Sequence, residues 1–396
     1  MAAGIYIHIP FCIRKCHYCD FFSKAIDSPD VRKDYTQALL QEITFYGKRY
    51  GKKFKADTIF FGGGTPSLME PELIDRIISA LKKNFTIEDN PEISMECNPA
   101  TLTPEKLAGY KAAGVNRLSI GVQSLDDEVL EELGRLHCEK DVIKTYKMAR
   151  KAGFDNISMD LMFSVPKLGI RKWRSVVKRT SGLKPDHISF YSLEIAENTE
   201  FGRRLKEGTL REQLVSIDRV MYHMAIDILK KRGFHQYEIS NMAMPGKECK
   251  HNKKYWSLED YMGLGASAHG YIKGVRYSNV CSIDKYINLM YGQDLSGENT
   301  LGDSEAYGAD CVADYYINTF KDNVSEYVFT ALRTNRGVVF DDFMKKFDRG
   351  FWDIYIDEKK RFDAYVKDGY AVSDEYHIAI TERGMDISNH IMAIFV

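Results

Sequence analysis

The chain lacks a strong net charge, a long apolar run and a large share of cysteine. Its 396 residues carry 55 Lys and Arg against 56 Asp and Glu, so no overall basic field favours nucleic acid as a partner. No run of about eighteen apolar residues exists, so we expect no transmembrane helix. The N-terminus has no charged start followed by an apolar core, so we expect no signal peptide. Eight cysteines are too few for a disulfide scaffold at this length, and these absences together favour a cytoplasmic, reducing setting.

The first half of the chain alternates between strand and helix patterns. We expect strands at residues 5–9, 57–61, 92–96, 117–122, 156–161 and 187–191. We expect helices between them at residues 30–50, 71–81, 103–113, from 126 onward, 141–152 and 173–180. Such alternation predicts parallel strands joined by right-handed crossovers, and its six units fall short of the eight in a closed β/α barrel.

The second half reads differently. Residues 214–228 form an amphipathic helix pattern, residues 236–239 a short strand, and residues 240–278 a loop-rich segment. A polar stretch at 291–304 resembles a linker, and the end of the chain shows three helices and a hairpin, typical of a winged-helix-like unit. From Val324 onward, 10 Lys and Arg face 13 Asp and Glu, which opposes DNA binding by this unit and favours a protein-facing or structural role. We therefore expect domains at 1–240, 241–305 and 306–396.

Three cysteines follow the first strand directly. Pro10 ends that strand because it has no N–H to donate, and Cys12, Cys16 and Cys19 then stand at the spacing C-x3-C-x2-C. A cubane [4Fe–4S] cluster has four iron corners, so three thiolates leave one corner open to an external ligand. Structural zinc with His17 or another residue as the fourth ligand remains an alternative.

Polar side chains and glycines stand where the other strands end. A glycine run, 62–64, follows the second strand, and Glu96, Gln123, Asp160 and Tyr191 end the next four strands with polar groups. In β/α barrels the carboxyl ends of the strands carry the active site. Each position alone has an ordinary structural explanation, such as a tight turn for the glycines, but five in order behind the cysteines predict one site.

The stretch Tyr-Ile-His-Ile-Pro-Phe-Cys at residues 6–12, with Cys-Asp-Phe at 19–21, resembles the signature of the radical S-adenosylmethionine (SAM) superfamily. More narrowly, it resembles the branch that holds oxygen-independent coproporphyrinogen III oxidases and HemW-like heme chaperones. The resemblance covers most of residues 5–275. It implies an α/β fold, namely a partial (β/α)6 barrel followed by a small winged-helix-like domain. It also implies a [4Fe–4S] cluster whose open iron is chelated by SAM, which the reduced cluster cleaves to a 5′-deoxyadenosyl radical.

The same resemblance assigns roles residue by residue. Cys12, Cys16 and Cys19 are the implied cluster ligands. Three of the residues that the resemblance assigns to SAM also have an ordinary structural explanation. Tyr6 could pack in the core of its strand, Tyr18 could shield the cluster, and Arg135 could form a surface salt bridge. The implied SAM contacts are Tyr6, Tyr18, Gly63, Gly64, Thr65, Glu96, Gln123, Arg135 and Asp160.

A second motif, His-Asn-Lys-Lys-Tyr-Trp at residues 251–256, matches the HNxxYW motif of HemW-like proteins, where this segment is associated with heme. Histidine is the usual axial ligand of heme iron, so the resemblance makes His251 the candidate ligand and His269 a second one. The alternative is a loop packed over the barrel mouth, with His251 hydrogen-bonded inside it. The neighbours suited to stack on a macrocycle or to meet its propionates are Tyr255, Trp256, Lys253 and Lys254.

These observations predict a heme chaperone that binds heme, a [4Fe–4S] cluster and SAM, and passes heme to an acceptor protein in the cytoplasm or at the inner face of the membrane. The alternatives are an oxygen-independent coproporphyrinogen III oxidase and another radical SAM enzyme acting on a tetrapyrrole. Two features favour the chaperone. Phe21 stands where the oxidases carry a further cysteine, and the cluster motif begins at residue 5, whereas the oxidases have a longer N-terminal segment.

Overall fold

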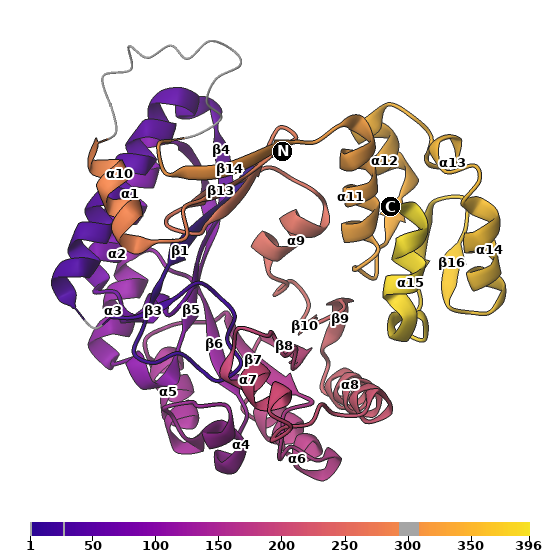
Figure 1. Ribbon diagram of the computed structural model, residues 1–396, viewed down its shortest axis with the longest axis horizontal. Coiled ribbons are helices and arrows are strands. Elements are labelled where there is room, and N and C mark those ends of the chain that lie inside the picture. Colours follow the sequence, from indigo (N-terminus) through magenta and orange to yellow (C-terminus); the bar gives the residue numbers. More distant parts are fainter. Residues whose placement is uncertain (1, 27, 293–308) are drawn as a thin grey trace.

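Six parallel strands form the centre of the protein (Figure 1). The computed structural model describes residues 2–26, 28–292 and 309–396. Each of the six strands pairs in parallel with the next one along the chain, which confirms the predicted partial β/α barrel. The strands are β1 (Ala3–Ile9), β4 (Lys55–Gly63), β5 (Thr86–Cys97), β6 (Arg117–Gln123), β7 (Ile157–Phe163) and β8 (His187–Ser192).

Helices cover the outer face of these strands, as the alternation predicts. Their ends follow local signals: the Thr103 hydroxyl accepts from the Lys106 N–H at one helix start, and Gly114 adopts a left-handed conformation at its end. The helices are α1 (Pro29–Tyr50), α2 (Pro71–Asn84), α3 (Pro104–Ala113), α4 (Asp127–Glu132), α5 (Glu139–Lys151), α6 (Ile170–Gly182), α7 (Glu200–Lys206) and α8 (Val215–Lys230).

Successive residues of each strand face opposite sides of the sheet, and the two sides differ in polarity. In β1, Ile5, Ile7 and Ile9 are fully buried in the hydrophobic core, while Tyr6 and His8 alternate with them. In the other central strands the same alternation directs polar side chains away from the helices and into the barrel. They are Ser94, Glu96, Ser119, Gln123, Ser158, Asp160, His187 and Tyr191.

The sequence predicts a loop-rich segment at residues 240–278, and this prediction is wrong. Several strands in this segment join the same sheet. Strand β11 (Tyr261–Leu264) pairs in parallel with β1, and Gly4 lies opposite Tyr261. These strands have three to six residues each, too few to show a clear alternation. The others in this part of the chain are β10 (Asn241–Ala243), β12 (His269–Ile272) and β13 (Val275–Asn279). On either side of it lie β9 (His235–Glu238), which matches the strand predicted at 236–239, and β14 (Val312–Ile317).

The sheet therefore continues past the boundary expected at residue 240. Its twelve strands run in the order β14-β13-β12-β11-β1-β4-β5-β6-β7-β8-β10-β9. Helix α9 (Lys250–Trp256) lies beside the sheet, and α10 (Ile283–Gly292) packs on α1. Most of the linker expected at 291–304 lies outside the described residues. No helix among the described residues is long and apolar enough to cross a membrane.

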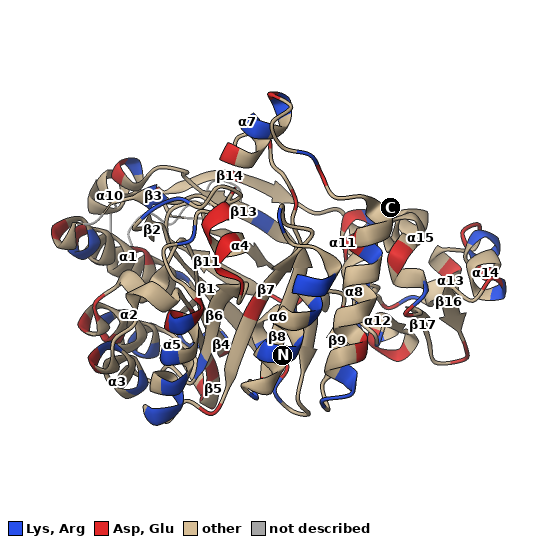
Figure 2. Ribbon diagram, turned by 90° about the horizontal axis from the view of Figure 1, so that it is seen from below, with Lys and Arg blue, Asp and Glu red and all other residues tan. Residues whose placement is uncertain are grey.

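A smaller domain follows β14 and lies beyond α9 in Figure 1. It contains the three predicted helices and the predicted hairpin, while its winged-helix-like character stays a prediction. Figure 2 shows acidic and basic residues interspersed over it. Its helices are α11 (Phe320–Ala331), α12 (Phe340–Phe347), α13 (Phe351–Ile354), α14 (Lys359–Lys367) and α15 (Ser388–Met392). Its sheet has the order β15 (Val338–Val339), β17 (His377–Ile380), β16 (Ala371–Ser373).

Backbone hydrogen bonds join the small domain to the edge of the large sheet. The Ile239 N–H donates to the carbonyl of Arg333 over 3.1 Å, and the Asn335 N–H donates to the carbonyl of Tyr237 over 3.2 Å. These bonds form between β9 and the segment linking α11 to β15, so the small domain is attached through main-chain groups as well as side chains.

Candidate functional site

A cavity opens at the carboxyl ends of the central strands and at the cysteine loop. Its volume, with the open mouth included, is about 790 Å³. It brings together the predicted cluster and SAM residues apart from Tyr6. The predicted residues that line it are Cys12, Cys16, Cys19, Tyr18, Gly63, Gly64, Thr65, Glu96, Gln123, Arg135 and Asp160.

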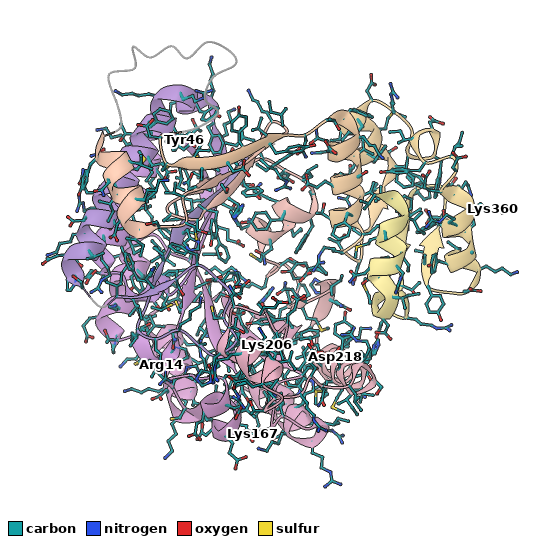
Figure 3. The ribbon with its side chains drawn as sticks, viewed as in Figure 1. Arg14, Tyr46, Lys167, Lys206, Asp218 and Lys360 are labelled. Carbon is teal, nitrogen blue, oxygen red and sulfur yellow. The ribbon has the colours of Figure 1, made fainter. Side chains whose placement is uncertain are left out.

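The cysteine loop is fastened to the far side of the barrel mouth. The main-chain N–H of His17 donates to the carbonyl of Leu133 over 3.1 Å, and its ring Nδ1 donates to the carbonyl of Glu132 over 2.9 Å. Arg14, labelled in Figure 3, donates to the carbonyl of Gly134 over 2.7 Å. The Nδ1 bond fixes the orientation of the His17 ring, and because metal-binding histidines are commonly held in this way, it does not by itself decide between the cluster and the zinc alternative.

The three thiols suit a cluster better than a single ion. No three His, Cys, Asp or Glu side chains in the described ranges converge closely enough to hold one metal ion. In a cubane each thiolate binds a different iron, so the thiols stand apart around the cluster. Cys12 lies against the glycine loop, with its Sγ 3.4 Å from the Thr65 hydroxyl, and Cys16 accepts from Arg135 over 3.5 Å. Soft sulfur donors lining an open cavity are what an iron–sulfur cluster requires.

The glycine run ends β4 and passes directly behind the cysteine loop. Gly63 has a φ of 111°, and a Cβ there would lie 2.6 Å from the Cε1 of His8. A Cβ on Gly64 would lie 2.7 Å from the carbonyl oxygen of Phe11. Only glycine therefore fits at either position, and the main chain itself forms this wall of the cavity.

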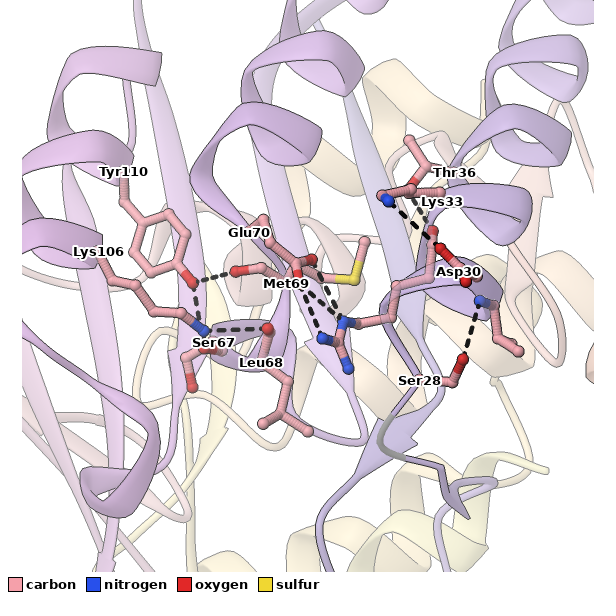
Figure 4. A network of polar contacts seen from close by, with 12 residues as sticks. Ser28, Asp30, Lys33, Thr36, Ser67, Leu68, Met69, Glu70, Lys106 and Tyr110 are labelled. Atoms are coloured by element: carbon pink, nitrogen blue, oxygen red, sulfur yellow. Dashed lines mark hydrogen bonds and ion pairs between the residues drawn. The ribbon is translucent and has the colours of Figure 1, made fainter.

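Side chains of α3 fix the loop that continues the glycine run (Figure 4). The Lys106 ammonium donates to the carbonyls of Ser67 and Leu68 over 2.9 and 3.0 Å. The Tyr110 hydroxyl bonds to the carbonyls of Ser67 and Met69 at 3.1 and 2.6 Å. Because both side chains are on a rigid helix, they hold the loop in place before any ligand arrives.

Two carboxyl groups stand close together on the cavity wall. Glu96 accepts from the N–H of Gly63 over 3.2 Å, and Asp160 accepts from Ser119 over 2.9 Å and from Ser158 over 3.0 Å. Burial, and then the negative charge of Asp160, raises the pKa of Glu96 to about 8. Burial also raises the pKa of Asp160. This pair therefore favours a cation or a set of hydroxyl donors in the cavity.

Arg135 and Gln123 line the cavity next to this pair, since Gly121 of β6 lies opposite Asp160 of β7. Arg135 donates to the carbonyl of Gly121 over 2.8 Å, and its Nε has no hydrogen-bond partner among the described residues. Gln123 has a φ of 62°, a strained backbone conformation, and its amide oxygen accepts from the Tyr191 hydroxyl over 3.0 Å. A guanidinium that lines a cavity suits a ligand carboxylate.

Tyr6 is the predicted SAM residue that does not line the cavity. Its hydroxyl lies 3.1 Å from Nδ1 of His8, and its ring stacks on Phe60. Sequence reasoning missed Asn98 and Ser119, which do line the cavity. Counting back by twos from a polar strand end would have identified Ser119, because it shares its face of β6 with Gln123.

His251 lies in the protein interior rather than at an open surface. The ring is fully buried between β4 and α9, with Nδ1 2.8 Å from the Thr58 hydroxyl and Nε2 2.9 Å from the Tyr255 hydroxyl. It stacks on Phe60 at 5.3 Å, and burial lowers its pKa to about 3. Both ring nitrogens are hydrogen-bonded inside the protein, as in the structural alternative, but the segment is a helix rather than a loop and contacts the middle of β4 rather than the barrel mouth.

The rest of the 251–256 segment points in several directions. Lys254 is buried in ion pairs with Asp57 and Glu259 at 2.8 and 2.9 Å, and Lys253 is exposed. Trp256 lines a second cavity, between α9 and the small domain. His269 is exposed at the start of β12. The segment therefore does not form the single cluster of ligand contacts that the resemblance implies.

Comparison with known proteins places these features in context. A family model for the radical SAM superfamily matches residues 6–179. The heme chaperone HemW of Bacillus subtilis is 36% identical over 99% of this chain and 98% of its own length. The heme chaperone HemW of Escherichia coli is 36% identical over 67% of this chain and 69% of its own.

The fold also matches a solved structure. Coproporphyrinogen III oxidase (HemN) from Escherichia coli, a radical SAM enzyme, superimposes with a TM-score of 0.84 at 23% identity, covering 100% of this chain and 90% of that one. At this identity the match establishes the architecture, and it includes the small domain.

Proposed function

This chain belongs to the heme chaperone HemW family within the radical SAM superfamily, and from that premise we propose that it binds heme and transfers it to an acceptor protein. The acceptor would be in the cytoplasm or at the inner face of the membrane. The observation that carries the proposal is that the similarity to HemW of Bacillus subtilis runs through 99% of the chain, the small domain included. A shared radical SAM barrel alone would not favour a chaperone over an enzyme.

The cluster and SAM belong to the same proposal. Cys12, Cys16 and Cys19 would each hold one iron and leave the fourth for SAM. Arg135 would stabilise the negative charge of the Cys16 thiolate, since it already donates to that sulfur. When bound, the reduced cluster would supply an electron to SAM, and the residues that line the cavity would bind and orient that cofactor.

Each wall of the cavity suits one part of SAM. The main chain at Gly63 and Gly64 can approach the amino acid end closely because no Cβ intervenes. Glu96 would accept hydrogen bonds from an ammonium or from ribose hydroxyls, and Arg135 would meet a carboxylate.

His251 can bind heme iron only if its surroundings in the protein interior change. For it to bind heme iron, its ring would have to give up its hydrogen bond with Tyr255 or with Thr58 and become accessible. If it is the axial ligand, His251→Ala will remove or shift the Soret band of the bound heme. If it serves only the interior, the variant will lose stability while any heme it binds keeps the wild-type spectrum.

The central experiment compares heme binding with oxidase activity in one anaerobic preparation. Reconstituted protein should contain about four irons and four sulfides per chain, because three thiolates and one external ligand complete a cubane. It should take up about one heme per chain with a shifted Soret band. It should not convert coproporphyrinogen III to protoporphyrinogen IX with reductant and SAM.

The oxidase alternative is decided by the same data. Phe21 is 69% exposed at the cavity mouth, where the resemblance places a further cysteine in the oxidases. Turnover of coproporphyrinogen III without heme binding would refute the chaperone proposal and establish the enzyme. A Phe21→Cys variant tests whether that position alone restores any turnover.

A further inference from the structure

A second cavity lies between α9 and the small domain, on the other side of α9 from the barrel. Its volume is about 1040 Å³ with its mouth, and residues of α9, α11 and α12 line it. Trp256 reaches this cavity, whereas His251, on the same helix, contacts β4. The cavity therefore presents a different face of the 251–256 segment from the one that His251 occupies.

Two aromatic side chains form its apolar part. Trp256 has the Arg333 guanidinium over its ring at 4.8 Å, and its buried Nε1 has no hydrogen-bond partner in the described part of the chain. Tyr327 is supported from behind by Phe343 and Phe347, whose ring centres lie 5.9 and 5.5 Å from its own. These neighbours hold each ring in place, so the two rings form walls that do not need to rearrange around a flat ligand.

Cations stand beside these rings. The Lys346 ammonium donates to the carbonyl of Leu258 over 2.7 Å and lies 5.8 Å from the Tyr327 ring centre, and burial lowers its pKa. Lys345 is exposed at the cavity and has no acidic partner within the described residues. Arg336 pairs with Asp342 at 2.7 Å.

The acidic residues of the cavity are already neutralised. Asp342 is paired with Arg336, and Glu259 accepts from Lys254 over 2.9 Å. The two lysines therefore leave an excess of positive charge next to an apolar, aromatic surface. A ligand that matches this distribution is planar, apolar over most of its area, and carries carboxylates at one edge.

We propose that this cavity is the heme-binding cleft, with the porphyrin plane against Trp256 and Tyr327 and the propionates at Lys345 and Lys346. The proposal rests on the heme chaperone function proposed above. It assigns most of the site to the small domain, so that heme is held between two domains rather than in the barrel.

Propionate recognition can be separated from ring packing by the choice of ligand. Heme and heme dimethyl ester share the macrocycle, but the ester has no carboxylates. Lys345→Glu should raise the Kd for heme about fivefold, as expected for one exposed ion pair, and leave the Kd for the ester unchanged. Trp256→Ala should weaken both ligands about tenfold, and Trp256→Phe should recover most of that loss. Soret titration gives each Kd.

The matched control is Lys360→Glu. Lys360 is an exposed lysine on α14 at the outer end of the same domain, far from α9 (Figure 3), and it receives the same charge change. The Lys360→Glu variant should bind heme and heme dimethyl ester with the same affinity as the wild type. Circular dichroism melting should show that Lys345→Glu is folded, so this variant decides the question even if Trp256→Ala is destabilised.

The outcomes distinguish the two levels of the proposal. If the wild-type protein takes up no heme, the proposed chaperone function fails. If the wild type binds heme and Lys345→Glu binds both ligands as tightly as the wild type does, only the cleft is refuted. Equal loss of heme affinity in Lys345→Glu and Lys360→Glu would show a general charge effect and would also refute it.

Discussion

The raised pKa of Glu96 predicts that SAM binding depends on pH. The carboxyl group lies on the cavity wall, receives the Gly63 N–H, and has a pKa of about 8 because of burial and the nearby Asp160. A bound ammonium or hydroxyl donor needs the ionised form, so ligand binding competes with the proton. Affinity should therefore rise with pH until Glu96 is ionised in the free protein, and it should stay constant above that.

The size of the effect follows from the pKa. At pH 7 a group with a pKa of about 8 is protonated in about ten molecules of eleven, so binding is opposed by about 1.4 kcal/mol. Between pH 6.5 and pH 8.5 the Kd for SAM should fall about 25-fold, if the bound state keeps Glu96 ionised throughout. Glu96→Gln accepts hydrogen bonds without titrating, so its Kd should lack this dependence.

Calorimetry on anaerobically reconstituted protein measures both the Kd and the protons released. The amino group of SAM titrates in a similar range, but it does so equally with the wild type and with Glu96→Gln. The difference between the two profiles therefore isolates Glu96. Below pH 8 the wild type should release up to about one proton more per SAM bound than the variant does. Parallel profiles for the two proteins would refute this account of Glu96.

Four further outcomes are expected. Replacing Cys12, Cys16 and Cys19 together with alanine should abolish bound iron and sulfide in colorimetric analysis, and full retention would refute the cluster assignment. His251→Ala should lower the free energy of unfolding in urea by about 2–4 kcal/mol, because it empties a buried site and leaves two hydroxyls without their partner, whereas a change under about 0.5 kcal/mol would contradict the buried position. Tyr110→Phe should weaken SAM binding about fivefold without changing the iron content, since it frees the loop after the glycine run; an unchanged Kd would show that the loop needs no such support. The cysteines that should each be dispensable for the cluster are Cys97, Cys138, Cys249, Cys281 and Cys311.

The central fold was predictable because its strands are apolar, five residues or longer, and separated by clear helix signals. Two strand ends were misjudged for local reasons: β4 continues into the glycine run, and β5 begins in the polar stretch at Thr86. Strands β10 to β13 were missed because each is short and is fixed by distant partners, as β11 is by β1. The hydrophobic pattern of a short segment does not show which distant strand the segment pairs with.

The cavity residues were predictable where the chemistry stands at strand ends. Parallel strands bring those ends to one edge, so Glu96 and Asp160 could be placed together without coordinates. The position of His251 could not be predicted in this way. A short motif shows that histidine and aromatic residues share a helix, but only the surrounding fold decides that His251 meets β4 and Trp256 meets the small domain.

The pairing of β1 with β11 has a consequence for synthesis of the protein. The first strand, which leads directly into the cysteine loop, has one neighbour at residues 55–63 and the other at residues 261–264. Its full pairing therefore has to wait until most of the chain has left the ribosome, and contacts this distant along the chain form slowly. Until then the cysteine loop follows a strand that is hydrogen-bonded to β4 on one side and has no partner strand on the other. Cluster insertion would thus follow the synthesis of residues 261–264, and translation stalled before residue 261 should yield a product that cannot retain iron.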